Sequence, residues 1–310
     1  MSTNLTPLYQ PGIERNLMLE FSEYPPYWKE FMHVDDTSMR INWDQTWSGY
    51  GMPPLRFPGQ PFMQGQFNPS FSKVYIQQGR GLGDAFPYED EEDDLYGVIR
   101  RVIPQRSGFM GVAFNTMVEL DVANFFTNQG FASGTVAGMP DGVCIWSTAH
   151  PYSLTNANTW SNTPSVASDF SVASYQAAAT NLRLQKRPDG VTVINGRPKK
   201  VMLNPALEYI AKQVLKSEWE PKTNDRNVNY IRDDKVEPVF WPYWNSSGST
   251  GTNNSWFVIG QEWWFRFIWR QGFRTFVDFD VNVAAQICNC SIRYAYGITS
   301  ALGSWGSPGV

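Results

Sequence analysis

One stretch of the chain has the apolar spacing of a long amphipathic helix. Its apolar side chains recur at intervals of four, four, three and three, which places them on one helix face. We predict a short helical piece over residues 93–103, a division at Pro104, and a longer piece from residue 107 to about 128, ended by Gly130. The residues that define the face are Phe109, Ala113, Met117, Leu120 and Ala123.

A run of six carboxylates, Glu89 to Asp94, comes directly before this helix. Carboxylates near a helix N-terminus interact favourably with the positive end of the helix dipole. We therefore interpret the run as the solvated start of the long helix. A divalent-cation site is the weaker interpretation, because the run lacks the fixed alternation of ligands that an EF-hand loop has.

Two shorter helices and a set of strands are predicted in the second half of the chain. Apolar spacing indicates one helix over residues 172–182, and the pair Asn204-Pro205, typical of a helix start, opens another. Asn195-Gly196 between two apolar runs predicts a hairpin. The segments with strand-like patterns are 191–194, 200–203, 236–244, 256–259, 263–269 and 273–283.

The ends of the chain lack the pattern of a self-supporting fold. Residues 1–50 carry four prolines and many aromatic side chains, so they must dock either on the same chain or on a neighbouring subunit. Residues 51–87 are punctuated by Gly and Pro around a strand-like run at 71–76, which predicts a hairpin. Such a hairpin is marginally stable alone, so it too needs a surface. The Gly/Ser-rich residues 297–310 are interpreted as a loop or tail.

The composition favours association with other chains. Charged residues make up 17% and aromatic residues 15% of the sequence, whereas charged residues are about a quarter of ordinary soluble domains. This balance is typical of interface cores, and a β-rich domain with aromatic strands would share it. The net charge of −4 comes without a basic stripe for nucleic acid. There is no apolar run of about 18 residues to span a membrane, and the N-terminus lacks the features of a signal peptide.

The chain offers few candidates for catalysis or metal binding. His33 and His150 are its only histidines, and its three cysteines have neither zinc-site nor redox-pair spacing. We therefore expect free thiols in a reducing cytoplasm, no metal site and no cofactor. We interpret His150, which precedes Pro151, as a turn residue with a packed ring. The glycine-rich residues 79–83 lack a phosphate-loop fingerprint and are interpreted as a hinge or turn.

Five short motifs follow one another between residue 93 and the end of the chain. They are Asp93-Asp94-Leu95-Tyr96, Ser147-Thr148-Ala149-His150-Pro151, Leu184-Gln185-Lys186-Arg187-Pro188-Asp189-Gly190, Val201-Met202-Leu203-Asn204-Pro205-Ala206-Leu207-Glu208 and Ile292-Arg293-Tyr294-Ala295-Tyr296-Gly297. In order and spacing the chain resembles the major capsid proteins of tailed bacteriophages with the Hong Kong 97 (HK97) fold, and within them most nearly the Mu-type major head subunits. Before residue 87 the resemblance depends on the order of elements alone.

This resemblance implies an α+β chain with the HK97-like capsid fold. The parts it implies are an N-terminal arm (1–50), an extended β-hairpin loop (51–87), a peripheral domain with a long spine helix (88–140), an axial α/β domain (141–269), and return strands of the peripheral domain with a C-terminal tail (270–310).

The resemblance also implies the function and the partners. The chain would be a major capsid (head) protein, not an enzyme, whose copies form the hexamers and pentamers of an icosahedral shell around double-stranded DNA. Expected partners are a separate scaffolding protein, a portal, a decoration protein, and packaged DNA that is contacted weakly and without sequence specificity. The protein would be assembled in the bacterial cytoplasm and reside in the virion, with no membrane contact. Inter-subunit contacts are expected at Trp28, Trp43, Trp47, Phe67, Phe71, Tyr75, Ile76, Glu91, Glu92, Arg100 and Arg101.

A β-rich protein that binds or cleaves carbohydrate, such as a phage tail component, is the alternative. Thirteen tryptophans could form a cleft that stacks on sugars, and Asp278 and Asp280 project from one face of a predicted strand. Two carboxylates about 5–10 Å apart can hydrolyse a glycosidic bond. Acids spaced in this way on a strand are nevertheless more often a solvated face.

Overall fold

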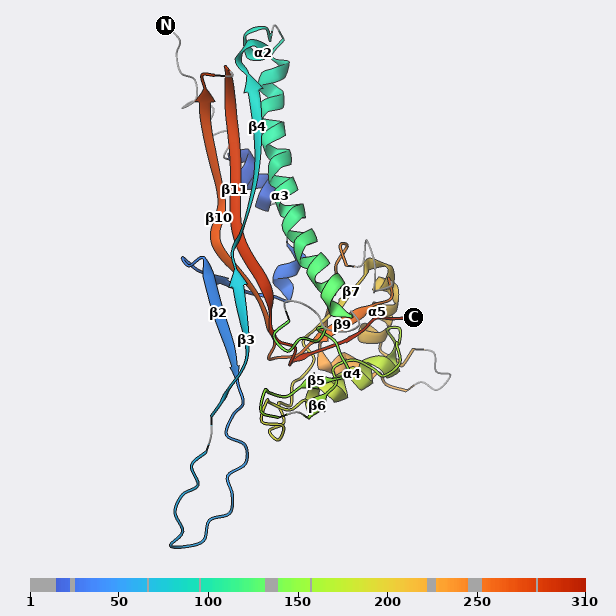
Figure 1. The fold of residues 1–310 in the computed structure, drawn as a ribbon. Helices are drawn as coiled ribbons and strands as arrows, with labels where there is room; N and C mark the ends of the chain where they lie inside the picture. The colour runs from blue at the N-terminus through green and yellow to red at the C-terminus, as the bar shows by residue number, and fades with distance from the viewer. Residues whose placement is uncertain are drawn as a thin grey trace.

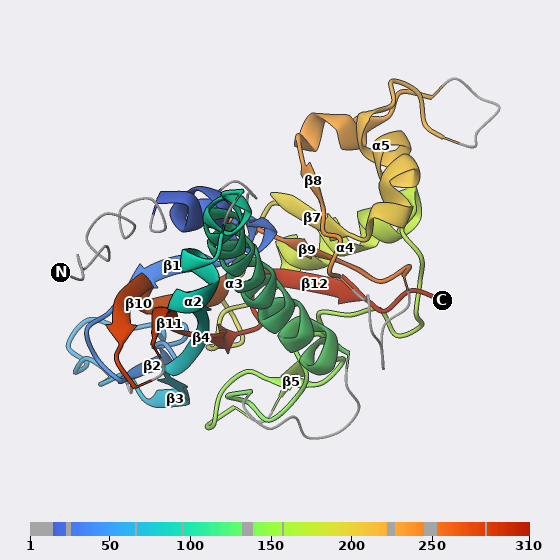
Figure 2. The same ribbon diagram turned by 90° about the horizontal axis from the view of Figure 1, so that it is seen from above.

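The computed structural model describes residues 15–22, 26–65, 67–94, 96–131, 139–156, 158–221, 227–244, 253–282 and 284–310. In this part of the chain, an elongated half is built on one long helix and a four-stranded sheet. A compact half holds a second four-stranded sheet with two helices (Figure 1). Seen from above, the first sheet and the compact half lie to either side of the long helix (Figure 2).

The long helix α3 spans Val98–Gly130 and continues without a break past residue 104. The acidic run is not its first turn, because Tyr88–Glu92 forms a separate short helix, α2. Gly97 separates the two with a φ of 66°, a conformation that glycine adopts at no steric cost. The predicted division at Pro104 was therefore wrong, and the predicted end at Gly130 is confirmed.

The buried face of α3 lies one residue further along than we predicted. Of the predicted face, Phe109 is 72% exposed and Ala113 is exposed too, whereas Ala123 is buried and Met117 packs against the core. A second apolar series with a spacing of four runs beside the predicted one, and tertiary packing selects it for the core. Its members are Met110, Phe114, Val118, Val122 and Phe126.

The first sheet packs against α3 and has the strand order β1-β10-β11-β4. Its strands are β1 (His33–Asp36), β4 (Gln78–Pro87), β10 (Trp264–Asp280) and β11 (Ala285–Ser300), with β1 parallel to β10 and the other pairs antiparallel. The two strands predicted over 263–269 and 273–283 are one strand. Register shifts between Trp269 and Arg274 bend β10 there without ending it.

The compact half contains the second sheet, in the order β12-β9-β7-β8. Its strands are β7 (Lys200–Leu203), β8 (Glu237–Phe240), β9 (Trp256–Ile259) and β12 (Ser304–Ser307). Helices α4 (Val172–Leu184) and α5 (Glu208–Lys216) confirm the two predicted helices. The short 3-10 helix η2 (Pro205–Leu207) precedes α5, and η3 (Tyr230–Asp234) and the strand pair β5 (His150–Pro151) and β6 (Thr159–Trp160) complete this half.

Local signals set the helix starts in this half. The Asn204 side chain accepts a hydrogen bond from the Ala206 amide, so the predicted cap is confirmed. Helix α4 opens with a capping box in which Ser171 and Ser174 exchange hydrogen bonds. Both caps involve neighbours in sequence; the Asn204 cap was predicted, and the capping box of α4 was not.

Two predictions for the compact half were wrong. The Asn195-Gly196 pair does not connect a hairpin, because β7 pairs with β8 and β9 instead, although Asn195 does have a left-handed φ of 52°. The Gly/Ser-rich C-terminus is not a tail, since β11 continues to Ser300 and all four residues of β12 are buried. Both errors come from pairing between segments far apart in the chain.

The N-terminal segment docks on its own chain wherever the structure describes it up to residue 36. Residues 15–22 are helical, and the 3-10 helix η1 (Tyr27–Glu30) leads into β1. Trp28 stacks on Phe267 of β10 with ring centroids 4.0 Å apart, and Phe31 packs against Phe126 of α3. One aromatic core thus joins the N-terminal segment, α3 and both sheets.

Candidate assembly surface

A two-stranded hairpin projects from the body at the end opposite α2 (Figure 1). Its strands are β2 (Ile41–Trp47) and β3 (Pro69–Ile76), paired antiparallel with Trp43 opposite Val74. The loop between them extends further still from the body. We define the hairpin surface as residues 39–76. The sequence-based range of 51–87 missed β2 and wrongly included β4.

The glycine-rich segment 79–83 is part of strand β4, not a hinge. Residues 78–87 pair with β11 over ten residues. Two of the residues that alternate with the glycines, Arg80 and Asp84, form ion pairs with α3. Arg80 Nη2 lies 2.9 Å from Asp121 Oδ2, and Asp84 Oδ1 lies 2.6 Å from Arg106 Nη2. Long-range pairing and these ion pairs outweigh the weak strand preference of glycine.

The root of the hairpin is fixed to the first sheet by a chain of polar contacts. The hydroxyl of Tyr75, which is 2% exposed, donates to Thr299 Oγ1 over 2.7 Å, and Thr299 donates to Asp44 Oδ2 over 2.7 Å. Arg266 Nη1 lies 3.2 Å from the same carboxylate oxygen. Burial raises the pKa of Tyr75 to about 12, so its hydroxyl stays a donor at neutral pH. The hairpin therefore leaves the body from a rigid base.

We expect the Tyr75→Phe variant to loosen this base. The substitution leaves Thr299 without its donor, and a lost hydrogen bond of this kind costs about 1–2 kcal/mol in the free energy of unfolding. Urea denaturation of the full-length subunit measures the change. Tyr209→Phe is the matched control, because Tyr209 is 77% exposed. Equal stability of the two variants would contradict a role for the Tyr75 hydroxyl.

Beyond the root, the hairpin surface is strongly apolar. Of the 35 large hydrophobic side chains exposed in the described part of the chain, 13 lie in these 38 residues. Arg56 is the only charged residue between positions 48 and 68, and its guanidinium lies over the Phe62 ring. The thirteen are Met39, Ile41, Trp43, Trp47, Tyr50, Met52, Leu55, Phe57, Phe62, Met63, Phe67, Val74 and Ile76.

The size and the apolar character of the hairpin surface are those of a protein-binding surface. Monomers rarely expose contiguous apolar patches beyond a few hundred Å², and larger ones mark interaction sites. Covering apolar surface contributes about 25 cal/mol per Å². An extended hairpin also offers backbone edges that can add to another chain's sheet. The hairpin surface therefore has the chemistry of a protein–protein contact.

The residues predicted to form contacts divide into those on the surface, those whose side chains the structure does not describe, and two that are buried. Trp43, Trp47, Phe67 and Ile76 are exposed on the hairpin, Phe71 is half-buried there, and Glu92 is exposed on α2. The side chains of Glu91, Arg100 and Arg101 lie outside the described part of the structure. A contact role for these residues stays a prediction.

The other two predicted contact residues are buried in the single subunit. Trp28 and Tyr75 are each 2% exposed and pack within their own chain. The most exposed residues of the loop were missed, among them Leu55 at 80% and Met63 at 76%. The signal that could have found them is a stretch of 21 residues, 48–68, with one charge and many large apolar side chains.

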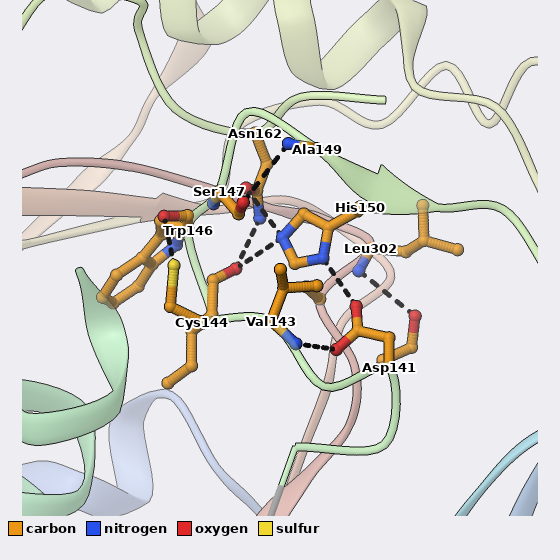
Figure 3. Close-up of polar contacts among 12 residues, drawn as sticks. Asp141, Val143, Cys144, Trp146, Ser147, Ala149, His150, Asn162 and Leu302 are labelled. Atoms are coloured by element: carbon orange, nitrogen blue, oxygen red, sulfur yellow. Dashed lines mark hydrogen bonds and ion pairs between the residues drawn. The ribbon is translucent and has the colours of Figure 1, made fainter. Parts of the chain in front are cut away.

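His150 has a structural role, as predicted, and its ring is fully buried (Figure 3). Its Nδ1 lies 2.6 Å from Asp141 Oδ2, and its Nε2 lies 3.1 Å from the Ile145 carbonyl oxygen and 3.2 Å from Asn162 Oδ1. The ring also stacks on Trp160. Both ring nitrogens are thus occupied by the chain itself.

The cysteines lack the features of nucleophiles. Cys144 donates to the Trp146 carbonyl oxygen (Figure 3), and burial raises the pKa of its thiol, whereas a reactive cysteine needs a lowered pKa. The pKa of Cys290 is also raised, mainly by its hydrogen bond with Cys288 and to a smaller extent by burial. Among the described residues, no three His, Cys, Asp or Glu side chains are grouped to hold a metal ion, and no helix is long and apolar enough to span a membrane.

The packing does not favour the sugar-cleft alternative. Six of the thirteen tryptophans are at most 3% exposed and form cores. Asp278 is exposed near the far end of β10, and Asp280 caps the following turn by accepting from the Asn282 amide. The tryptophans are Trp28, Trp146, Trp241, Trp244, Trp256 and Trp305.

The mixed helix and sheet architecture belongs to the class found in phage capsid structures. The capsid structure of cyanophage P-SCSP1u matches with a TM-score of 0.56 at 12% identity, over 90% of this chain and 86% of that chain. A structure from Microbacterium phage Oxtober96 matches at 0.54 and 9% identity, over 91% and 90%. The capsid of a native GTA particle matches at 0.53 and 10% identity, over 92% and 90%.

These likenesses concern the fold, since the identities are low. No protein-family model matches the chain, and no curated protein matches its sequence. The matches nevertheless extend over nearly the whole length of both chains.

Proposed function

We propose that this chain is the major capsid protein of a tailed bacteriophage. Its copies would form the hexamers and pentamers of an icosahedral shell that encloses double-stranded DNA. The observation that carries the proposal is the apolar hairpin surface, which one chain leaves uncovered, on a fold whose structural neighbours are capsids. The role is structural, without catalysis or cofactor.

The proposal assigns the parts of the HK97-like fold to the observed elements. The extended loop is β2, β3 and the loop between them, and the peripheral domain is α3 with the sheet of β1, β4, β10 and β11. The axial domain is the compact half, which β12 extends to the C-terminus. We propose the Mu-type head subunits as the nearest subclass, on the five sequence motifs alone.

Closed shells require contacts that are repeated around an axis. Rings of identical subunits use heterologous interfaces, in which a projecting element of one copy meets a different surface of the next. The hairpin has the shape and chemistry of such an element. Further partners in the proposal are a scaffolding protein, a portal and a decoration protein. DNA would be contacted weakly, since the net charge is −4. Assembly would take place in the bacterial cytoplasm, with the protein then residing in the virion.

Expression of the full-length chain tests the proposal. We expect ring oligomers or closed shells, with copies related by six-fold and five-fold axes in electron micrographs. Co-expression with a scaffolding protein is the second arm, because scaffold-dependent subunits stay as rings or monomers alone. A monomer in both arms, with tryptophan fluorescence that changes on adding oligosaccharide, would favour the carbohydrate alternative.

A further inference from the structure

A buried carboxylate in the middle of α3 joins three separate segments of the chain. Glu119 is 4% exposed. Its Oε1 accepts a hydrogen bond from the Tyr27 amide over 2.5 Å, and its Oε2 accepts one from Trp241 Nε1 over 2.7 Å. The carboxylate also accepts from the Trp28 amide. The three donors come from η1 and from the segment that follows β8.

Glu119 performs the work of a helix cap for η1. The first amides of any helix lack partners within that helix and need acceptors from outside. Pro26 precedes η1 and provides no side-chain cap. The carboxylate of Glu119, on α3, accepts the hydrogen bonds of the first two amides of η1. These bonds hold η1 on α3.

No charged side chain in the described part of the chain balances this carboxylate. On η1, Lys29 and Glu30 are exposed; Lys29 lies over the Trp28 ring and Glu30 pairs with Lys200.

The charged side chains on the other elements that pack around Glu119 contact other groups. On α3, Asp121 is engaged by Arg80 and Tyr294. In the helical residues 15–22, Glu20 lies against Gly108 and Gly111. The segment after β8 carries Tyr243 as its titratable group. Burial, opposed only by the three hydrogen bonds, raises the pKa of Glu119 to about 7.

We propose that Glu119 is a proton-controlled latch that sets how firmly residues 15–22 and 26–36 are held on α3. A conformation in which this segment lifts away would hydrate the carboxylate and return its proton affinity to that of an ordinary glutamate. The docked conformation therefore binds the proton more tightly than the lifted one. By linkage, acid favours docking and ionisation favours lifting. The inference concerns the subunit and does not depend on the capsid assignment.

The sign and the pH window follow from the pKa. The ordinary glutamate value is 4.5 and the docked value is about 7. Protonation of Glu119 stabilises docking. This stabilisation is fully present when the pH is below the ordinary glutamate pKa, and it is lost as the pH rises through the pKa of the docked state. A separation of this size corresponds to a change of about 100-fold or more in the docking equilibrium.

Hydrogen exchange of the full-length chain tests the latch. We expect protection of the amides of residues 27–32, corrected for the intrinsic pH dependence of exchange, to fall about 100-fold between about pH 5 and about pH 8. In Glu119→Gln, which is neutral at every pH, protection should not change over this range. Asp121→Asn, which removes a carboxylate from the same helix, should keep the wild-type profile.

Two results would overturn the proposal. One is a flat wild-type profile, which decides the matter even if Glu119→Gln does not fold. The other is a pH-dependent profile in Glu119→Gln equal to that of the wild type, since the Glu119 carboxylate is absent from that variant and could not be the cause. Shell formation has no part in this readout, so the capsid assignment can fail while the latch stands.

Discussion

Replacing Phe57, Phe62 and Met63 together by serine is expected to abolish shell formation and to leave the subunit folded. These side chains are 60–76% exposed in the hairpin loop and contribute nothing to the core. Burying one large apolar side chain at an interface contributes about 1.5–3 kcal/mol, so three of them weaken each contact by several powers of ten. The free energy of unfolding should change by less than about 0.5 kcal/mol.

Electron microscopy and sedimentation velocity measure the assembly, and urea denaturation measures the fold. The control replaces Leu154, Val166 and Val310 by serine, because these side chains are 70–76% exposed outside the hairpin. We expect this control to form shells. Shells from the loop variant would contradict the role of the hairpin surface, and loss of shells in both variants would show that apolar exposure anywhere on the chain drives assembly.

Trp146→Ala is expected to cause a large loss of stability in the subunit. Trp146 is 2% exposed and packs against Phe131 and Phe257, with ring centroids 4.8 and 4.7 Å apart. It stands where the end of α3 meets β12. Truncation of a buried tryptophan to alanine costs about 3–5 kcal/mol, because the cavity cannot close fully. Urea denaturation of the full-length chain measures the loss.

A double-mutant cycle makes this prediction specific. The indole lies so close to Gly306 that a Cβ there would sit 2.6 Å from its ring. Gly306→Ala should therefore cost about 1–3 kcal/mol by overpacking in the wild-type chain. In Trp146→Ala the same methyl group has room, so the cost should largely disappear. Additive effects of the two substitutions would contradict the packing described for this site.

The sequence predicts the helices better than the strands because helix signals are local. The Asn204-Pro205 start and the Gly130 end act within a few residues, and both were found. The strands β4 and β12 were read as a hinge and a tail, since glycine and serine normally interrupt strands. Their pairing with β11 and β9 involves residues at least 45 positions away, and no local pattern records it.

Contact residues were harder to predict than the fold class. Trp28 and Trp43 look alike in the sequence, yet one is 2% and the other 61% exposed. Alternation along β3 separates Val74 and Ile76, which face outward, from Tyr75, which faces the body, but only once the sheet beneath the hairpin is known. The aromatic content alone fits both an interface and a β-rich core, and it does not show which residues would meet a neighbour.

Strand β3 ends at Ile76 and β4 begins at Gln78, so the hairpin and the first sheet share one nearly unbroken strand. A pull on the hairpin from outside would act along the axis of β4, which is paired with β11 over ten residues. Hydrogen bonds in such a ladder lie across the strands and are loaded together in shear rather than opened one at a time. In a shell under internal pressure, this continuity would spread tension from the tip of each hairpin into the sheet of its own subunit.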